Sequence, residues 1–418
     1  MSPSTSSIDT VCVIGLGYIG LPTAAVFAQA GKTVIGVDIK QSSVDLINAG
    51  TVPFVEVGLE TVLKDVVERG LLSARTDTPE ARAYIVSVPT PFKGDHDADL
   101  SYIEAAARGI AAKLRGGELV VLESTSPPGA TEHMGDVIVS ERPDLTLEVG
   151  QENSIYLAHA PERVLPGRIM VEMVENDRII GGTTPEAAQM CRDLYASFCK
   201  GELLLTDART AEMAKLTENA FRDVNIAFAN ELSIIADKQG IDVWELIKLA
   251  NHHPRVNILQ PGPGVGGHCI AVDPWFIVSA DRENAKLIAT ARQVNDSKPE
   301  LVIAQVLEKA EKLKDPVVAA LGIAFKANID DLRESPSKNI ALELADRLDH
   351  GTVLVVEPNI EQLPREFDGK TNVELAGVRD GIERADIVLL LVDHDPFRMV
   401  SREDLAEKIV IDTKGLWR

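Results

Sequence analysis

The sequence predicts an α/β protein in which two doubly wound sheets are joined by a long central helix. Short strands that are apolar on both faces alternate with helical stretches in the first half of the chain, and again near its end. This alternation is typical of parallel sheets covered by helices on both faces. Between the two regions, helical periodicity continues for about 30 residues without a strong breaker. We therefore expect an α/β domain over residues 1–200, a helical segment over 201–300 and a second α/β domain over 301–418.

The individual elements follow in chain order. In the first domain we expect a helix at 22–29 and strands at 11–14, 34–37, 84–88, 119–122, 155–158 and 178–180. The middle segment should hold a helix at 209–239, about 45 Å long, with further helices at 243–250 and 284–306. The last domain should have a helix at 338–348 and strands at 317–323, 353–356, 387–392 and 409–412.

Composition excludes several classes of protein. The chain has 418 residues, and 42 Lys and Arg against 64 Asp and Glu give a net charge of −22. Such an acidic surface argues against nucleic-acid or membrane-surface binding, and no apolar stretch approaches the length of a membrane span. The first ten residues resemble no secretory signal. Four cysteines without CxxC spacing predict neither a disulfide framework nor a metal site, so we expect a reduced, cytoplasmic protein.

A glycine motif follows the first predicted strand and begins the first helix. Gly15 would form the tight turn, Gly17 would let the backbone approach a pyrophosphate, and Gly20 would let helix and strand pack closely. The helix N-terminus supplies amide donors for that pyrophosphate. Asp38 ends the second strand, where its carboxylate would bind the ribose hydroxyls. The motif therefore predicts a dinucleotide site that prefers NAD to NADP.

Two groups of polar residues lie where chemistry would take place. Thr90 and Thr125 follow strands, and ligands of such sheets bind outside the carboxyl ends of the strands. Lys215, Asn219 and Arg222 share one face of the long predicted helix. A Lys and an Asn so placed can hold an alcohol oxygen while a hydride leaves the carbon. The alternatives are ordinary helix capping for the threonines and a solvated face for the helix.

The segment 261–270 holds four glycines and two prolines and then presents Cys269, with Asp273 four residues later. Such a loop lets the backbone approach a ligand closely. A thiol beside a nicotinamide could attack an aldehyde, and the thiohemiacetal formed is a second hydride donor. The three remaining cysteines are expected to be small buried residues: Cys12, Cys191 and Cys199.

Local cations in an acidic chain predict a phosphate-ester substrate, because Arg binds phosphate through paired donors. They come from three segments, which contribute Arg163 beside Glu162, His253 with Arg255, and Lys326 with Arg333.

The chain resembles, essentially end to end, the nucleotide-sugar 6-dehydrogenase family. The motifs that carry the resemblance are GLGYIG at Gly15, VPTP at Val88, ESTSPPG at Glu123, KLTENAFRDVNIAFANE at Lys215, GPGVGGHCIAVDP at Gly262 and AFKANIDDLRESP at Ala324. Within the family, PERVLPG at Pro161 and the stretch from His253 look like the UDP-N-acetyl-D-mannosamine 6-dehydrogenases of bacterial surface-polysaccharide synthesis.

The resemblance implies two Rossmann-like domains, an NAD domain and a UDP-sugar domain, joined by a helical segment that forms a homodimer. It implies oxidation of the sugar C6 alcohol to a carboxylate with two NAD. Cys269 would be the nucleophile, and Lys215 with Asn219 the acid/base or oxyanion group. Asp273, Glu162 and Thr125 would assist the water that opens the thioester. The matched cofactor positions are Gly15, Gly17, Tyr18, Ile19, Gly20, Asp38, Thr90, Thr125 and Arg333; the matched substrate positions are Arg163, Val164, Lys215, Asn219, Arg222, His253, Arg255, Gly264, Phe325 and Lys326.

Three alternatives stay open. The same reaction could act on UDP-N-acetylglucosamine or UDP-glucose. A two-electron β-hydroxyacid dehydrogenase shares the Rossmann domain and the Lys–Asn helix but needs no nucleophilic Cys. A non-catalytic dinucleotide sensor needs neither Cys269 nor Lys215. The number of NADH formed per sugar separates the four-electron, two-electron and non-catalytic cases.

Overall fold

The computed structural model describes residues 8–54, 56–165, 167–267 and 270–418. The chain divides into two compact units, residues 1–217 and Glu218–Arg418. The division falls within α8 (Ala208–Gln239), the long helix that the periodicity predicts. The predicted boundaries near residues 200 and 300 stay a prediction.

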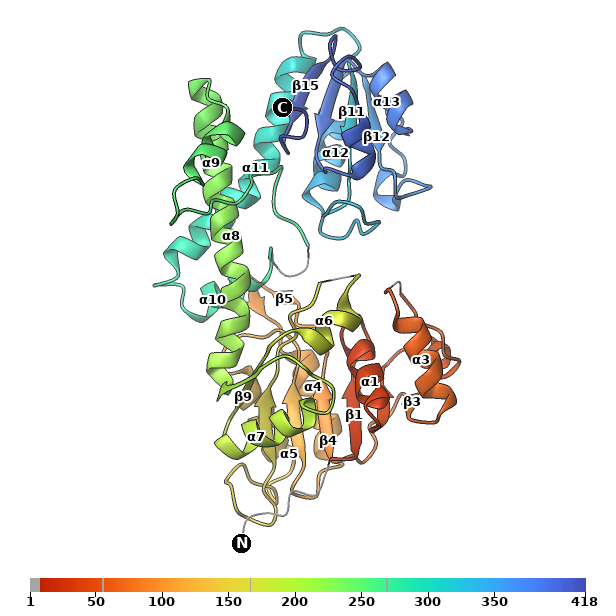
Figure 1. The fold of residues 1–418 in the computed structure, drawn as a ribbon, viewed down its shortest axis with the longest axis vertical. Coiled ribbons are helices and arrows are strands. Elements are labelled where there is room, and N and C mark those ends of the chain that lie inside the picture. The colour runs from red at the N-terminus through yellow and green to blue at the C-terminus, as the bar shows by residue number, and fades with distance from the viewer. Residues whose placement is uncertain (1–7, 55, 166, 268–269) are drawn as a thin grey trace. The chain divides into compact units, whose positions relative to one another are not determined.

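The first unit is built on one twisted sheet (Figure 1). Six parallel strands follow the order 3-2-1-4-5-6 of a Rossmann domain. These strands are β3 (Leu72–Arg75), β2 (Thr33–Val37), β1 (Thr10–Ile14), β4 (Ala83–Val86), β7 (Leu119–Leu122) and β8 (Tyr156–His159). The predicted α/β fold class is confirmed.

The edge of this sheet differs from the expected parallel arrangement. Strand β9 (Arg178–Gly182) runs antiparallel to β8, and β10 (Leu203–Asp207) pairs with β9 in parallel. A strand apolar on both faces carries no signal for its direction, which is why the sequence predicted the strand but not its sense.

Alternation along the strands separates two cores. Val11 and Val13 of β1 face one core, and Cys12 and Ile14 face the other. The first core lies under α1 (Gly20–Gln29), α2 (Gln41–Asn48), α3 (Leu59–Glu68), α6 (Ile169–Glu175) and α7 (Pro185–Tyr195). The second lies under α4 (Ser101–Ala111) and α5 (Ala130–Glu141), and β5 (Phe92–Lys93) pairs with β6 (Asp97–Ala98) as a separate hairpin.

The second unit contains the other sheet, with strand order 3-2-1-4-5 and every pair parallel. The strands are β13 (Val373–Leu375), β12 (Thr352–Val356), β11 (Val317–Leu321), β14 (Ile387–Leu390) and β15 (Ile409–Asp412). Helix α12 (Pro336–Arg347) packs on one face and α13 (Val378–Arg384) on the other (Figure 1). Short 3-10 helices span Arg365–Phe367 and Asp395–Met399.

The helical part of the second unit packs on α8. Helix α9 (Val243–Ala250) buries Val243 and Ile247 against Ala229 and Ala236 of α8. Helix α11 (Lys286–Ala310) continues to the sheet, where Val302, Ile303 and Val306 join its core. Helix α10 (Asp273–Ala280), which the periodicity missed, begins just after the glycine-rich segment.

Candidate active site

The turn between β1 and α1 uses its three glycines for three different purposes. Gly15 has φ +90°, and a Cβ there would lie 2.2 Å from the carbonyl oxygen of Ser87. A Cβ on Gly20 would lie 1.8 Å from the carbonyl oxygen of Gly15. Around Gly17 no atom lies within 4 Å of the Cβ position, and the residue is exposed. The turn thus leaves room for a ligand at Gly17 alone.

The side chains around this turn fit a dinucleotide. Asp38 accepts hydrogen bonds from the backbone N–H of Leu16 at 3.1 Å and of Lys40 at 2.9 Å, and a carboxylate has lone pairs beyond these two. The Tyr18 ring stacks on Phe54 with centroids 4.7 Å apart. The Thr90 hydroxyl oxygen is buried and has no hydrogen-bond partner in the described part of the chain. A bound NAD would give the Thr90 hydroxyl a hydrogen-bond partner and would fill the open space at Gly17.

Ser124 ties together the carboxyl ends of β4 and β7. Its hydroxyl donates to the carbonyl oxygen of Val88 at 2.7 Å and accepts from the N–H of Val88 at 2.9 Å. Thr90 and Thr125 follow on the two clamped segments, and both are partly buried. The structure therefore places the two predicted hydroxyl residues beyond the carboxyl ends of the neighbouring strands β4 and β7. Strand β4 borders the switch point beside β1, where such folds bind ligands.

Glu162 belongs to a buried charge cluster that the sequence did not reveal. The Arg178 guanidinium pairs with Glu162 and lies 3.8 Å from Glu123. Glu123 also accepts hydrogen bonds from Thr23 at 2.9 Å and Tyr195 at 3.1 Å. Burial raises the pKa of Glu123 to about 7, although Arg178 opposes the shift. The Arg178 guanidinium thus interacts with the carboxylates of both Glu162 and Glu123.

Arg163 and Val164, predicted to bind substrate, follow Glu162 directly. The backbone N–H of Arg163 donates to Glu162 at 2.7 Å, and its guanidinium donates to the carbonyl oxygen of Asp177. Both residues are partly buried, and Val164 packs against the core beneath α6.

Lys215 is held in the first unit by a contact one turn earlier in α8. Glu212 is fully buried and accepts the N–H groups of Gly129 at 2.6 Å and Thr131 at 2.8 Å, at the start of α5. A carboxylate at that helix N-terminus is favourable and fixes α8 against α5. Near Lys215, which is itself buried, burial lowers the pKa of His159 to about 3, and the charge of Lys215 acts in the same direction. His159 is therefore neutral beside the lysine.

In the second unit, Asn219 donates a hydrogen bond to Asp273 at 2.6 Å, and both side chains are buried. The pair connects α8 with the first residue of α10. Arg222, predicted on the same face as Asn219, is exposed.

The glycine-rich segment approaches another part of the chain rather than the open space that we expected for a ligand. A Cβ on Gly266 would lie 2.4 Å from the carbonyl oxygen of Glu334, and one on Gly264 would lie 2.8 Å from Pro336. At Gly267, which has φ +85°, the Cβ would lie 3.2 Å from the Phe325 ring. The segment is therefore packed on the loop between β11 and α12. Cys269 lies outside the described residues.

A cavity of about 200 Å³ opens where that loop meets the end of β14. Its lining includes Gly264, Phe325 and Lys326, three of the positions that the family resemblance assigned to substrate. Sequence analysis missed Lys414, which also lines it and lies 3.7 Å from Asp393. Nothing in the sequence connected Lys414 with Lys326, since they follow different strands. Two lysines against one aspartate leave a net positive charge in the cavity, suited to phosphate.

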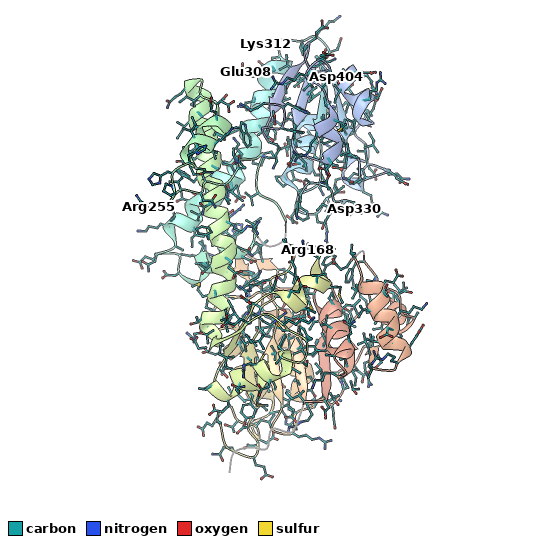
Figure 2. All side chains as sticks on the ribbon, viewed as in Figure 1. Arg168, Arg255, Glu308, Lys312, Asp330 and Asp404 are labelled. Carbon is teal, nitrogen blue, oxygen red and sulfur yellow. The ribbon has the colours of Figure 1, made fainter. Side chains whose placement is uncertain are left out.

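Other predicted cations lie outside this cavity. Arg333 donates to the Asp331 carboxylate from Nε at 2.8 Å and from Nη2 at 2.6 Å. His253 and Arg255 are exposed after α9, and Arg255 lies on the far side of α8 from the C-terminal sheet in Figure 2.

Comparison with known proteins decides the family. The chain matches the UDP-glucose/GDP-mannose dehydrogenase family in its NAD binding domain over residues 9–199, its central domain over 209–297 and its UDP binding domain over 319–418. The chain belongs to this family. It is therefore an oxidoreductase that uses NAD, which decides against a non-catalytic sensor and against a β-hydroxyacid dehydrogenase.

Two curated relatives and one solved structure are similar over nearly the whole chain. The NDP-N-acetyl-D-galactosaminuronic acid dehydrogenase of Ralstonia nicotianae is 57% identical over 98% of this chain and 96% of that protein. The UDP-N-acetyl-D-mannosamine dehydrogenase of Salmonella typhi is 56% identical over 99% of this chain and 100% of that protein. A UDP-D-ManNAc dehydrogenase structure from Pyrococcus horikoshii is 37% identical, with a TM-score of 0.85, and covers 98% of this chain and 96% of that chain.

Two further properties concern the described residues only. They contain no cluster of three or more His, Cys, Asp or Glu side chains that could hold a metal ion. Among the same residues, no helix combines the length and the apolar character needed to cross a membrane.

Proposed function

We propose that this dehydrogenase oxidises C6 of UDP-N-acetyl-D-mannosamine from the alcohol to the carboxylate for bacterial polysaccharide synthesis. The observation that carries the choice of sugar is the set of relatives named UDP-N-acetyl-D-mannosamine dehydrogenase, which are 53% to 56% identical over 99% of this chain. The PERVLPG segment from Pro161 supports the same choice.

The cofactor would lie on the turn at Gly17, with the Asp38 carboxylate at its ribose and the Thr90 hydroxyl within reach of it. When bound, the cofactor accepts the hydride. Lys215 and Asn219 would hold the C6 oxygen as the C–H bond breaks. Cys269 would add to the aldehyde, and loss of a second hydride from that thiohemiacetal leaves a thioester. Water then opens the thioester, and the thiol is regenerated. The balance is one alcohol, one water and two NAD converted to one carboxylate, two NADH and three protons.

Two carboxylates, those of Glu162 and Asp273, would support the hydrolytic step, and each is oriented by a neighbouring side chain. Arg178 pairs with Glu162 and orients its carboxylate, while Asn219 orients Asp273. We propose that Glu162, Asp273 and Thr125 position the attacking water. The remaining matched residues, Arg163, Val164, Arg222, His253, Arg255 and Arg333, are proposed ligand contacts.

A second candidate substrate follows from the 57% identical relative named NDP-N-acetyl-D-galactosaminuronic acid dehydrogenase. The test is a panel of UDP-N-acetyl-D-mannosamine, UDP-N-acetylgalactosamine, UDP-N-acetylglucosamine and UDP-glucose, with NADH and uronate both quantified. We expect two NADH per sugar and the highest kcat/KM for UDP-N-acetyl-D-mannosamine. A higher kcat/KM for any other sugar in the panel contradicts the proposed substrate.

The thiol is tested by replacing Cys269 with Ala, beside Cys199→Ala as the matched control. Cys199 is partly exposed, contrary to the expectation of a buried residue, and its thiol faces the carbonyl oxygen of Asn176 at 3.5 Å. We expect Cys269→Ala to bind NAD and UDP but to form no uronate at a normal rate, with two NADH per sugar retained in the control. Normal uronate formation by Cys269→Ala would falsify the covalent mechanism.

We also propose a homodimer in the cytoplasm. Phe221, Phe228 and Ile235 recur every seven residues on α8 and are 67%, 50% and 44% exposed, so one face of the helix is apolar and uncovered in the single chain. Sedimentation at micromolar protein should show a dimer that Phe228→Glu dissociates and Lys238→Gln does not. The free thiols of Cys12, Cys191 and Cys199 fit a reducing compartment.

A further inference from the structure

The loop between β11 and α12 carries two predicted substrate contacts although it has no regular structure of its own. It spans residues 322–335, and Asp330 marks it below the C-terminal sheet in Figure 2. Phe325 lies against Gly267, and Lys326 lines the charged cavity. A loop of this length needs specific contacts to hold two side chains in register.

Those contacts begin at Glu357, the residue that follows β12. One carboxylate oxygen accepts the backbone N–H groups of Ile323 at 2.9 Å and Ala324 at 3.2 Å, and Nε2 of His394 lies 3.0 Å from the same oxygen. The other oxygen accepts both the N–H and the side-chain amide of Asn359. Glu357 is buried, so each of these bonds forms away from water.

His394 provides a second attachment point for the loop, beyond Phe325 and Lys326 in the sequence. It is fully buried, and its Nδ1 accepts the backbone N–H of Asn328 at 2.9 Å. Since that N–H can only donate, Nδ1 carries the lone pair. The ring hydrogen is then on Nε2, which donates a hydrogen bond to Glu357. Asn328 has φ +62° and its side-chain oxygen accepts the N–H of Asp395 at 2.9 Å. The loop is thus held at 323–324 and at 328, on both sides of Phe325 and Lys326.

We propose that Glu357 and His394 are positioning residues for UDP-sugar binding, and that they act by fixing the loop that carries Phe325 and Lys326. The proposal rests on the proposed function only in that this cavity receives the UDP-sugar. It goes beyond that function because neither residue needs to touch the ligand. The decisive feature is the tautomer of His394, since only the unprotonated Nδ1 can accept from Asn328.

Two substitutions of His394 separate its hydrogen bond with Asn328 from its hydrogen bond with Glu357. In His394→Asn the amide oxygen occupies the place of Nδ1 and keeps the Asn328 anchor. In His394→Gln the longer amide reaches Glu357 but leaves the Asn328 N–H without its acceptor. We expect KM for the UDP-sugar, and Kd for UDP by calorimetry, to rise about tenfold in His394→Gln and less than about threefold in His394→Asn. KM for NAD should change in neither variant.

Glu357→Gln tests the same point without changing the histidine. Both oxygens of Glu357 accept hydrogen bonds, so an amide in its place must turn its NH2 group toward donors. In one orientation these are the N–H groups of Ile323 and Ala324 and Nε2 of His394, and in the other they are the two donors of Asn359. The KM for the UDP-sugar should rise as in His394→Gln, and this variant decides the matter if His394→Gln does not fold. His350→Gln, at an exposed histidine of the same unit, is the control.

The outcomes distinguish this proposal from the proposed function. If the wild-type enzyme oxidises none of the sugars in the panel, the proposed function is contradicted. The UDP affinities of the variants still test the role of Glu357 and His394 in that case. Equal UDP affinity in His394→Asn and His394→Gln, together with an unchanged affinity in Glu357→Gln, overturns the positioning role. A merely structural role predicts equal losses of thermal stability and no separation of KM for the two ligands.

Discussion

The two Rossmann-like sheets begin alike and then bind different partners. In each, a glycine follows the first strand with a positive φ, +90° at Gly15 and +84° at Gly322. In each, the glycine N–H donates to the carbonyl oxygen that ends the second strand, Val37 at 2.8 Å and Val356 at 2.9 Å. In each, an acidic residue follows that second strand. Asp38 accepts the backbone N–H of Leu16 in the first turn, and Glu357 accepts those of Ile323 and Ala324 in the second.

The difference lies in what covers the acidic residue and in the length of the turn. The first sheet enters α1 after residues 15–19, with Gly17 exposed and Asp38 half-buried. In the second, Ala324 stands where Gly17 would be and is fully buried, and His394 covers Glu357. The first sheet therefore leaves Asp38 and Gly17 open to a ligand. In the second sheet Glu357 and Ala324 are hydrogen-bonded to each other within the protein, and the loop that follows carries the ligand contacts instead. Sheet order alone does not determine the ligand; the turn does.

The largest expected effect comes from closing the open turn. In Gly17→Val the new side chain meets no atom of the chain, so the free energy of unfolding should change by less than about 0.5 kcal/mol. It would occupy the space of the pyrophosphate, and kcat/KM for NAD should fall at least about 100-fold, or roughly 2.7 kcal/mol. Steady-state kinetics with varied NAD measures this. Gly377→Val, at an equally open glycine of the second sheet, is the control, and an unaltered KM for NAD in Gly17→Val would place the cofactor elsewhere.

The next effect belongs to the second sheet. Lys414 and Lys326 oppose a single Asp393 in the cavity, so Lys414→Met should remove the excess positive charge. We expect KM for the UDP-sugar to rise about tenfold, because a charge-assisted contact to phosphate is lost, with KM for NAD unchanged. Lys312→Met is the control, since Lys312 pairs with Glu308 of α11 at 3.1 Å and both side chains are exposed (Figure 2). A parallel rise in both KM values would show that the cavity is not specific to the sugar nucleotide.

A smaller effect concerns the two acidic residues themselves. The Asp38 carboxylate would repel the 2′-phosphate of NADP, so the wild-type enzyme should prefer NAD at least about tenfold. Asp38→Asn should reduce that preference about tenfold by removing the charge. Glu357→Gln should leave the ratio of kcat/KM for the two cofactors as it is, because Glu357 is buried in the other sheet. Equal use of NAD and NADP by the wild-type enzyme contradicts this role for Asp38.

Local patterns predicted most of the fold. Helix α9 begins and ends where the periodicity placed it, at Val243 and Ala250, and β7 and β15 agree residue by residue. Strand β3 was missed because buried and exposed residues such as Ser73 alternate along it, and β10 was missed although it begins with three leucines, of which Leu204 and Leu205 are exposed. A strand with mixed exposure gives a weaker apolar signal than one buried on both faces.

Local spacing placed site residues together only where they are neighbours in sequence, whereas Gly264, Phe325 and Lys326 were matched through the family resemblance. The glycine turn and Asp38 lie within one βαβ unit, and their spacing is enough to place them together. Glu212 has the local appearance of a solvated helix residue, yet it is buried at the start of α5. His394, Glu357 and Lys414 come together only after the second sheet has formed, and no local spacing links them. Long-range polar contacts are therefore the part that the sequence analysis could not supply.

Two buried carboxylates, one in each unit, extend the comparison to pH. Burial opposes the charge of both. For Glu123, bonded by two hydroxyl groups and sharing Arg178 with Glu162, burial prevails and raises its pKa from 4.5 to about 7. For Glu357, burial is outweighed by the hydrogen bonds from His394 and from the backbone, so its pKa lies below 4.5. The two groups should therefore shift stability with pH in opposite directions.

The last and smallest effect is that opposite pH dependence. Because the native state keeps the Glu123 proton that the unfolded chain releases, this group lowers stability as pH rises from 4.5 to about 7, by at most about 1.4 kcal/mol per pH unit. Glu123→Gln should remove that slope, so its Tm relative to wild type should increase over the interval. Glu357 stabilises the fold above pH 4.5 and loses that contribution as pH falls through its lowered pKa. Glu357→Gln should thus lose most stability near neutral pH and approach wild type in acid. Calorimetric Tm values of both variants across this range test this, and Tm curves that change with pH in the same direction for both variants would contradict the opposite pH dependence.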